Sequence, residues 1–226
     1  MPSVLICPLC HGKQIEPWHR DRCRDYLRCL VCELVFVPAS FHLDTPAEKA
    51  IYDQHENHPA DVGYRRFLMR LTQPLLQRLP PQSTGLDFGC GPGPALAAML
   101  REAGHSVALY DKFYFPDATV LQQQYDFICA TEVLEHLPDP RAVLDSLFAC
   151  LRPGGWLGVM TKRARDQEAF ARWHYILDPT HICFFSDHTF GWIATHWGAR
   201  LEMLGNDVVL LQKNDVTEQY GTDIHR

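Results

Sequence analysis

The sequence lacks the features that mark several specialised classes of protein. Nowhere in its 226 residues is there an uninterrupted apolar run of about 18 residues, the length that a membrane-spanning helix needs. The opening residues contain no basic segment, long apolar segment or small-residue cleavage site, so a secretory signal peptide is not expected. Excess positive charge is also missing, because 21 Lys and Arg residues stand against 27 Asp and Glu residues. We therefore expect a soluble, cytoplasmic protein with no membrane partner, and nucleic acid is disfavoured as a partner.

Cysteine, by contrast, is abundant and unevenly distributed. Five of the nine cysteines lie within the first 40 residues, namely Cys7, Cys10, Cys23, Cys29 and Cys32. Cytoplasmic thiols stay reduced, so we interpret these cysteines as thiols or metal ligands and not as a disulfide framework. The rest of the composition is that of an ordinary globular chain, because 46% of the residues are apolar and 21% are charged.

The first 40 residues have the pattern of a zinc ribbon. The pairs Cys7/Cys10 and Cys29/Cys32 each have C-x₂-C spacing, and the 18 residues between them are typical of four-cysteine structural zinc sites. A segment this short cannot build an apolar core of its own, and metal binding would supply the missing folding free energy. We therefore predict that these four cysteines bind zinc. The alternative is that the two C-x₂-C pairs are degenerate and bind no metal. Cys23 is interpreted as a buried spare thiol or a substitute ligand.

The remainder of the chain divides into a helical segment and a larger region in which strands and helices alternate. Apolar residues recur at helical spacing before Pro80, which indicates two helices whose Tyr52, His55 and Tyr64 would close over a ligand. The alternation that follows predicts an α/β fold, with a Rossmann-like, mostly parallel sheet and helices on both faces. The expected domains are a zinc ribbon over residues 1–40, a helical cover or linker over 41–81, the core over 82–213 and a polar tail over 214–226.

Turn and capping residues set the expected boundaries within the core. Asp139 before Pro140 is a helix N-cap, Ser186 is another, and Gly198 ends the helix that Ser186 begins. The expected strands are a run into Asp87, residues 106–110, 125–131 and 156–161, and a final pair around Asn206. The expected helices cover residues 94–103, 139–152, 166–173 and 186–198.

A glycine-rich turn lies where the first core strand meets its helix. It has the pattern D-x-G-x-G-x-G, formed by Asp87, Gly89, Gly91 and Gly93. Such glycines let the backbone approach a bound ligand closely. A dinucleotide fingerprint would need Gly or Ala where Pro94 stands, so the sequence fails that test. A second acid, Asp111, ends the next strand and can accept two ribose hydroxyl protons.

At these residues the chain resembles the class I S-adenosylmethionine-dependent methyltransferases. The strings YDFI at residues 125–128, EVLEHL at 132–137 and LRPGG at 151–155 also match, so the resemblance extends over about residues 62–212. It implies that the three glycines border the methionine and ribose parts of the cofactor. It further implies that Asp87 holds the cofactor's amino group, that Asp111 binds its ribose, and that Thr131 and Glu132 line the pocket beside the sulfonium.

The chain departs from this family between Asp111 and Tyr125. The family usually fits a further helix and strand here, which end near the adenine, whereas this segment is too short for both at full length. We expect Phe113, Tyr114 or Phe115 to replace the missing contacts by stacking on the adenine.

The segment from Phe170 to Trp197 combines many aromatic residues with four histidines, and we interpret it as the wall against which a methyl acceptor binds. His174 and His181 flank an expected loop and are the general-base candidates, with a purely structural role for each as the alternative. Glu132, at the tip of its strand, is the third catalytic candidate.

The string E-x-x-E-H predicts a second metal site. On one helical turn Glu132, Glu135 and His136 would share a face and could bind Mg²⁺, Mn²⁺ or Zn²⁺, with His181 completing the set. The string resembles the metal-binding motif of ubiquinone-pathway O-methyltransferases and small-RNA 2′-O-methyltransferases. Alternatively, as in metal-free relatives, the histidine only caps or packs.

These observations together predict a methyltransferase that uses S-adenosylmethionine and acts on a small-molecule acceptor by in-line methyl transfer. One alternative is an RNA or protein methyltransferase whose ribbon docks the substrate. The other is a non-catalytic interaction protein that binds a nucleotide.

Overall fold

The main sheet has six strands and is mostly parallel, as the sequence predicts. The structure, a computed structural model, describes residues 5–54 and 58–215. The sheet order is β5-β4-β6-β7-β10-β9, in which β4, β5, β6 and β7 run parallel and β10 and β9 are antiparallel to their neighbours. The strands are β4 (Thr84–Phe88), β5 (Ser106–Tyr110), β6 (Tyr125–Thr131), β7 (Leu151–Met160), β9 (Ala199–Leu204) and β10 (Val208–Lys213).

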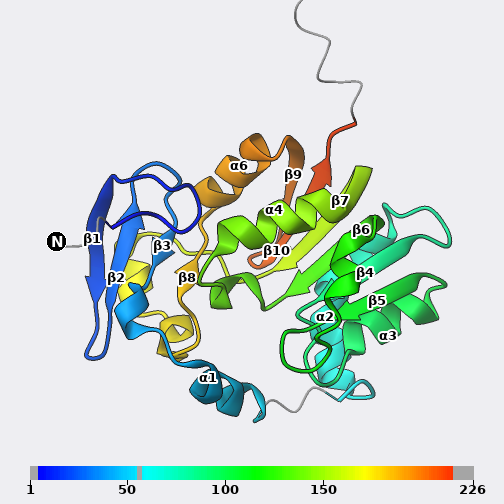
Figure 1. The fold of residues 1–226 in the computed structure, drawn as a ribbon, viewed down its shortest axis with the longest axis horizontal. Helices are drawn as coiled ribbons and strands as arrows, with labels where there is room; N and C mark the ends of the chain where they lie inside the picture. The colour runs from blue at the N-terminus through cyan, green and yellow to red at the C-terminus, as the bar shows by residue number, and fades with distance from the viewer. Residues whose placement is uncertain (1–4, 55–57, 216–226) are drawn as a thin grey trace, which may run out of the picture.

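Helices cover both faces of this sheet (Figure 1). On one face α2 (Val62–Leu76) and α3 (Ala95–Glu102) pack against alternate residues of β6 such as Phe127 and Cys129. On the other face α4 (Pro140–Cys150) and α6 (Asp187–His196) pack against the intervening residues Ile128 and Ala130. Both sets of β6 side chains are buried, because a parallel strand in the middle of such a fold is covered on both sides.

The cysteine-rich segment forms a small antiparallel sheet that extends into the core region. Its strands are β1 (Ile15–Arg20), β2 (Asp25–Cys29) and β3 (Val35–Phe36), and the fourth is β8 (Cys183–Phe184), which pairs with β3. Buried rings and aliphatic side chains from both segments pack together behind this sheet, including Tyr26, Phe170 and Phe184. In Figure 1 the blue strands accordingly lie beside the yellow segment. The cysteine-rich segment is therefore joined to the core by a shared sheet.

The helix N-caps expected at Asp139 and Ser186 are confirmed. The Asp139 side chain accepts a hydrogen bond from the Ala142 amide, and Ser186 forms a capping box with Thr189. The helix after Asp139 ends at Cys150, two residues earlier than expected, because β7 begins at once. The other elements are η1 (Ala39–Phe41), α1 (Thr45–Tyr52), η2 (Ala118–Gln122), η3 (Leu134–His136), α5 (Gln167–Ala171) and η4 (His174–Leu177).

The connection between β5 and β6 is as short as the sequence indicates. It contains only the 3-10 turn η2, so β5 is the edge of the main sheet. Among the helices of the described ranges, none has the length and apolar character that crossing a membrane would require.

Replacing Gly89, the residue directly after β4, tests whether the glycine-rich turn requires a left-handed backbone. Its φ is +71°, and a Cβ there would lie 2.4 Å from Cγ2 of Val133. We expect Gly89→Ala to lower the free energy of unfolding by about 1–3 kcal/mol, because the left-handed backbone and the close contact both disfavour a side chain. Urea denaturation measures this change.

The matched control is Gly191→Ala within α6, where a Cβ meets nothing within 4 Å. That variant should gain about 0.5–1 kcal/mol, since Ala is the better helix former. Equal stabilities of the two variants would contradict the analysis.

Candidate functional site

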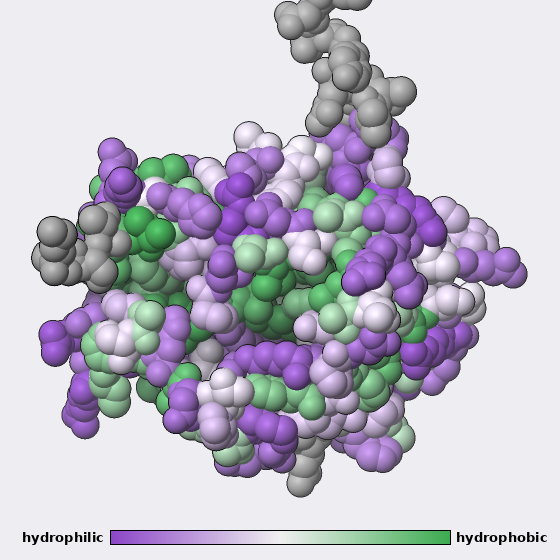
Figure 2. Space-filling model, in the orientation of Figure 1, coloured by the Kyte–Doolittle hydropathy of each residue, from purple (hydrophilic) through white to green (hydrophobic). Residues whose placement is uncertain are grey.

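A cavity of about 540 Å³ opens at the carboxyl ends of β4, β5 and β6. This is the edge at which ligands bind in open parallel sheets, and the volume lies within the range of small-molecule sites. The cavity is also lined by Tyr52 of α1 and by Tyr64 and Phe67 of α2. Figure 2 shows the face of the molecule that is hollowed and apolar at its centre, above α1.

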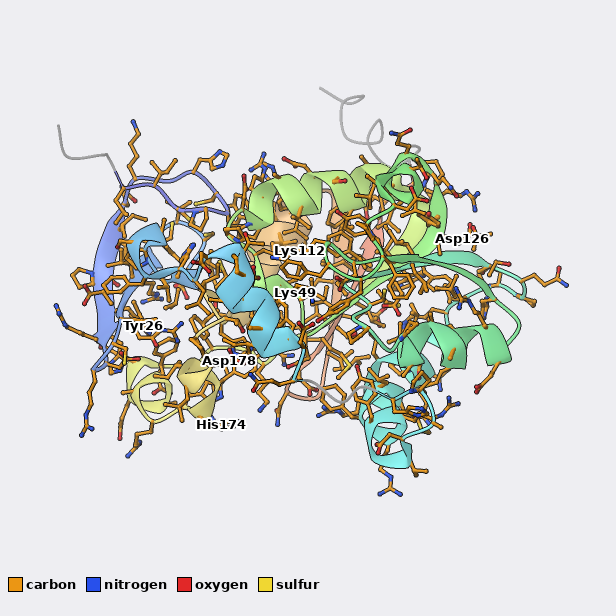
Figure 3. The ribbon with its side chains drawn as sticks, turned by 60° about the horizontal axis from the view of Figure 1, so that its bottom comes forward. Tyr26, Lys49, Lys112, Asp126, His174 and Asp178 are labelled. Atoms are coloured by element: carbon orange, nitrogen blue, oxygen red, sulfur yellow. The ribbon has the colours of Figure 1, made fainter. Side chains whose placement is uncertain are left out.

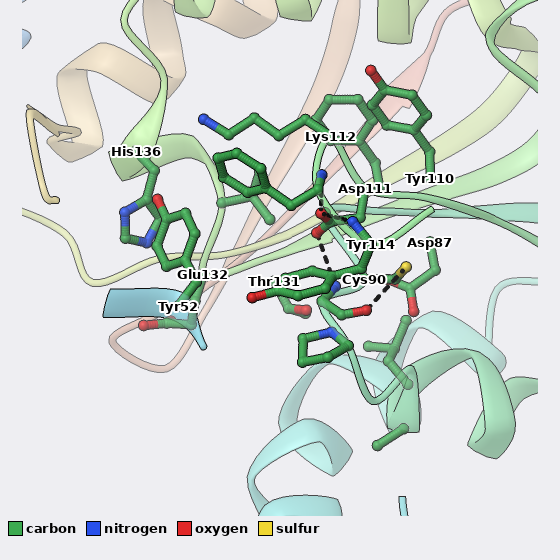
Figure 4. Close-up of a pocket in the computed structure, with 18 of the residues that line it drawn as sticks. Tyr52, Asp87, Cys90, Tyr110, Asp111, Lys112, Tyr114, Thr131, Glu132 and His136 are labelled. Atoms are coloured by element: carbon green, nitrogen blue, oxygen red, sulfur yellow. Dashed lines mark hydrogen bonds between the residues drawn. The ribbon is translucent and has the colours of Figure 1, made fainter. Parts of the chain in front are cut away.

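The glycine-rich turn forms the base of the cavity and is held by the carboxylate of Asp111. Asp111 accepts hydrogen bonds from the amides of Gly91 at 3.0 Å, Phe113 at 2.8 Å and Tyr114 at 3.1 Å (Figure 4). Gly89 and Gly91 line the cavity and both have positive φ, whereas Gly93 is not among the lining residues. Asp111 therefore joins the turn after β4 to the turn after β5.

Asp87 is a buried acid with one unpaired oxygen facing this region. It is 1% exposed and lines the cavity. Its Oδ2 accepts a hydrogen bond from the Ala97 amide, while Oδ1 has no partner among the residues that the structure describes. Burial raises the pKa of Asp87 to about 7. An ammonium group in the cavity would satisfy both the free oxygen and the charge.

The tip of β6 differs from the expected helical turn. Thr131 and Glu132 both line the cavity, but Glu132 has a φ of +52° and only Leu134–His136 form a 3-10 turn. The expectation of one regular helical turn from Glu132 to His136 is therefore wrong. The physical reason is the Glu132 amide, which bonds to the carbonyl of Met160 in β7 and keeps this residue with the sheet.

A carboxylate and two imidazoles nevertheless converge beside Glu132. Ligand atoms of Glu135, His136 and His181 lie within 4.8 Å of one another, a group that does not include Glu132. Glu135 is fully buried, and its Oε2 has no hydrogen-bond partner within the described part of the chain. Its other oxygen accepts a hydrogen bond from Tyr175, whose hydroxyl is also 3.3 Å from Oε2 of Glu132.

The electrostatics of this cluster disfavour charge in the absence of a partner. Burial raises the pKa of Glu135 to about 8, and the neighbouring Glu132 adds to that shift. Burial lowers the pKa of His181. The Nδ1 atoms face the backbone, that of His136 at 3.1 Å from the Thr180 carbonyl and that of His181 at 2.8 Å from the Tyr175 carbonyl. Imidazoles whose orientation is fixed by a backbone carbonyl are typical of metal ligands.

The two candidate bases have different surroundings. His181 lines the cavity, whereas His174 is exposed, lies outside the lining and has its Nε2 2.8 Å from Nζ of Lys162. In Figure 3 His174 is at the outer side of its segment and Asp178 lies nearer to α1. Of the two histidines, only His181 is in a position to reach a bound molecule.

The interpretation of residues 170–197 as an aromatic acceptor wall is wrong. Phe170, Tyr175 and Phe184 are buried against Tyr26 of β2, and from this segment only Asp178 and His181 line the cavity. The pairing of β3 with β8 draws these rings under the cysteine-rich sheet.

The aromatic lining comes instead from the helical cover, from Phe88 and Tyr110 at the ends of β4 and β5, and from the turn after β5. Phe113 and Tyr114 line the cavity and Phe115 does not. Polar contacts hold α1 over this turn, because Lys112 donates to Glu48 at 2.7 Å and Tyr114 donates to Asp53 at 2.7 Å. His55 lies outside the described residues. The lining residues Glu48 and Phe67 have no sequence signal beyond the helical spacing of the cover.

The four paired cysteines form a second, separate candidate centre. The sulfurs of Cys7, Cys10, Cys29 and Cys32 lie within 4.8 Å of one another, which fits one tetrahedral ion. The amides of Gly12 and Val31 donate to two of these sulfurs, as they do to thiolates. Cys23 is exposed and outside the group, so its expected burial is wrong.

Comparisons of the sequence with known proteins agree with this geometry. A family model described as "Methyltransferase domain" matches residues 61–203, more than half of the chain. Two curated relatives are each 35% identical to this chain. They are the ubiquinone biosynthesis O-methyltransferases of Serratia proteamaculans (strain 568), over 74 residues, and Klebsiella pneumoniae (strain 342), over 72 residues. These matches cover 33% and 32% of this chain, and they span only 31% and 30% of the relatives' own length.

Two solved structures share the fold. One is the 1,6-didemethyltoxoflavin-N1-methyltransferase of Burkholderia thailandensis, solved with 1,6-didemethyltoxoflavin and S-adenosylhomocysteine bound. Its TM-score is 0.52 at 17% identity, and the match covers 83% of this chain and 99% of that one. The other is an S-adenosylmethionine-dependent methyltransferase from Archaeoglobus fulgidus, with a TM-score of 0.52 at 14% identity over 66% of this chain and 94% of that one. At sequence identities this low, the structural similarity shows a shared fold and no more than that.

Proposed function

Because the chain belongs to the class I S-adenosylmethionine-dependent methyltransferases, we propose that it transfers a methyl group from S-adenosylmethionine to a small-molecule acceptor. The observation that carries this proposal is a single cavity of about 540 Å³ that joins the glycine-rich turn to His136 and His181, beside which Glu135 is buried. The similarity to a ubiquinone biosynthesis O-methyltransferase and to a 1,6-didemethyltoxoflavin-N1-methyltransferase supports a small-molecule acceptor.

The proposed cofactor site consists of Asp87, Gly89, Gly91, Asp111 and Thr131. When bound, S-adenosylmethionine supplies an electrophilic methyl group on a positively charged sulfur. The free oxygen of Asp87 suits its ammonium group, and the carboxylate of Asp111 stands beside the turn where the ribose would lie. Holding cofactor and acceptor in line lowers the activation barrier of methyl transfer, because the entropy cost of orienting the two reactants is paid on binding. The rings of Tyr52 and Tyr64 would exclude water, and Phe113, whose amide is bonded to Asp111, would stack on the adenine.

The proposed acceptor site includes a divalent ion held by Glu135, His136 and His181. The unpartnered, buried oxygen of Glu135 is the observation that supports a cation here, and two imidazoles with a carboxylate suit Zn²⁺ or Mn²⁺. Such an ion lowers the pKa of a hydroxyl group that it binds. Glu132 would then act from the edge of the site, through Tyr175. If no ion binds, His181 remains the candidate general base.

The four cysteines near the N-terminus would hold a structural zinc ion. The proposed division of the chain is the ribbon over residues 1–40, the helical cover over 41–81, the methyltransferase core over 82–213 and the tail over 214–226. Of this tail, residues 216–226 lie outside the described part of the chain.

The cofactor site is tested by replacing Asp111. Asp111→Ala should weaken binding of S-adenosylhomocysteine by at least about tenfold, or 1.4 kcal/mol, because three amides of the two turns lose their common acceptor. Isothermal titration calorimetry measures the affinity. Glu168→Gln, an exposed acid in α5, is the control and should bind like the unaltered protein. Unchanged affinity of Asp111→Ala would exclude the proposed cofactor site.

The second metal site is tested with Mn²⁺, whose free form has a strong electron paramagnetic resonance signal. Added to chelator-treated protein, Mn²⁺ should lose that signal on binding, and His181→Ala should weaken the binding at least about tenfold because a ligand is removed. His174→Ala, the exposed histidine outside the cavity, is the matched control. If Mn²⁺ and Mg²⁺ do not bind, and neither these ions nor Zn²⁺ change methyl transfer, the proposal of a second metal site is wrong.

The ribbon site is tested by a pair of cysteine variants. Cys29→Ser should remove the bound zinc and lower the unfolding temperature by several degrees, because the metal replaces an apolar core in this segment. Cys23→Ser, which alters the exposed thiol outside the group, should keep both. Zinc content by mass spectrometry and thermal unfolding are the measurements, and equal zinc content in the two variants would count against the site.

A further inference from the structure

Arg24 is a buried arginine at the end of the β1–β2 hairpin, and its side chain points into the core region instead of into solvent. It is 7% exposed. Its guanidinium donates to four backbone carbonyls of one short turn, those of Ile176 at 2.6 Å, Asp178 at 3.1 Å, Pro179 at 3.0 Å and His181 at 3.0 Å. A planar guanidinium with several fixed donors is suited to such a site, because each carbonyl must approach from its own direction.

The turn that Arg24 holds carries residues of the cavity. Both Asp178 and His181 line the cavity, and the carbonyl of the intervening Thr180 is 3.1 Å from Nδ1 of His136. The direction in which His181 points therefore depends on the path of the backbone from Ile176 to His181. That path contains the end of the short turn η4 and no strand before β8. Within it, Asp178 accepts hydrogen bonds from Thr180 and from the amide of His181, and Arg24 adds donors from outside the turn.

The backbone of Arg24 is itself fixed by the hairpin. Oδ1 of Asp21 accepts hydrogen bonds from the amides of Cys23 and Arg24, at 2.6 Å and 2.7 Å. Oδ2 of the same acid accepts from the hydroxyl of Tyr26, which lies 3.3 Å from the Ile176 carbonyl. Figure 3 shows Tyr26 on the side of the molecule where the segment with His174 and Asp178 lies. The strand that follows, β2, ends at Cys29 of the four-cysteine group.

We propose that Arg24 is a positioning residue through which the cysteine-rich segment sets the conformation of residues 176–181 and so directs His181 and Asp178 into the cavity. The cysteine-rich segment would thus help to determine the geometry of the acceptor side of the site. The consequence for ion and acceptor binding rests on the proposed function, whereas the conformational effect does not.

The experiment is hydrogen–deuterium exchange with mass spectrometry on the full chain carrying Arg24→Gln. Amides in peptides that cover residues 174–184 should exchange at least about tenfold faster, since four carbonyls, two of them in buried hydrogen bonds, lose their donors and the turn opens more often. Peptides from β4 and α3 should keep their protection, and zinc content and S-adenosylhomocysteine affinity should stay within about twofold of the unaltered protein. Affinity for Mn²⁺ should fall at least about tenfold.

Two further variants sharpen the test. Arg22→Gln removes an exposed arginine from the same hairpin and should leave the exchange of residues 174–184 unchanged. Arg24→Lys keeps the charge but lacks the planar set of donors, so it should restore protection only in part.

Several results would overturn the proposal. The first is unchanged exchange of residues 174–184 in Arg24→Gln. The second is a uniform loss of protection that includes β4 and α3, which would make Arg24 a general stability residue. If Arg24→Gln does not fold, Arg24→Lys decides between the same outcomes. Should the unaltered protein fail to bind S-adenosylhomocysteine, the proposed function fails, while the exchange data still judge the role of Arg24.

Discussion

Parallel pairing of β5, β4, β6 and β7 is the constraint on which the arrangement of the site depends. It brings the carboxyl ends of β4, β5 and β6 to one edge, so residues distant in sequence become neighbours there. Each of these three strands has one site residue at or next to its carboxyl end, namely Asp87 for β4, Asp111 for β5 and Thr131 for β6. The ladder fixes the strand ends, and two of the turns that follow are held together by the three amides bonded to Asp111 and by the amides of Gly89 and Cys90, which donate to the Tyr110 carbonyl.

Much of the fold could be predicted because its signals are local. Capping residues such as Asp139 and Ser186, the strand over 125–131 and the spacing of the four cysteines all depend on a few neighbouring residues. The site was predictable only where it lies on these elements. The left-handed backbone of Glu132 follows from its bond to Met160 on another strand, and the burial of Phe170 follows from the pairing of β3 with β8. Arg24 looks like a surface charge in the sequence, because nothing nearby reveals the four distant carbonyls.

The shared sheet of β1, β2, β3 and β8 changes the meaning of the cysteine-rich segment. A metal-binding segment tethered by a linker would leave the cavity unaffected, whereas here its strand β3 extends a sheet that contains Cys183 and Phe184. The amide of Val37 bonds to the carbonyl of Ile182, whose own amide bonds to the carbonyl of Glu135. A continuous series of backbone hydrogen bonds therefore leads from the cysteine-rich segment to the cluster of Glu135, His136 and His181.

The position of β5 at the edge of the main sheet has a consequence for how this cavity varies during evolution. The wall formed by Phe113 and Tyr114 belongs to a connection that takes no part in the six-stranded ladder. Lengthening such a connection costs little, about 0.6 kcal/mol for each doubling of a flexible loop, and leaves the strands in register. Insertions and deletions at this place can therefore reshape one side of the ligand site while the remaining sides, which are built on strand ends, stay the same.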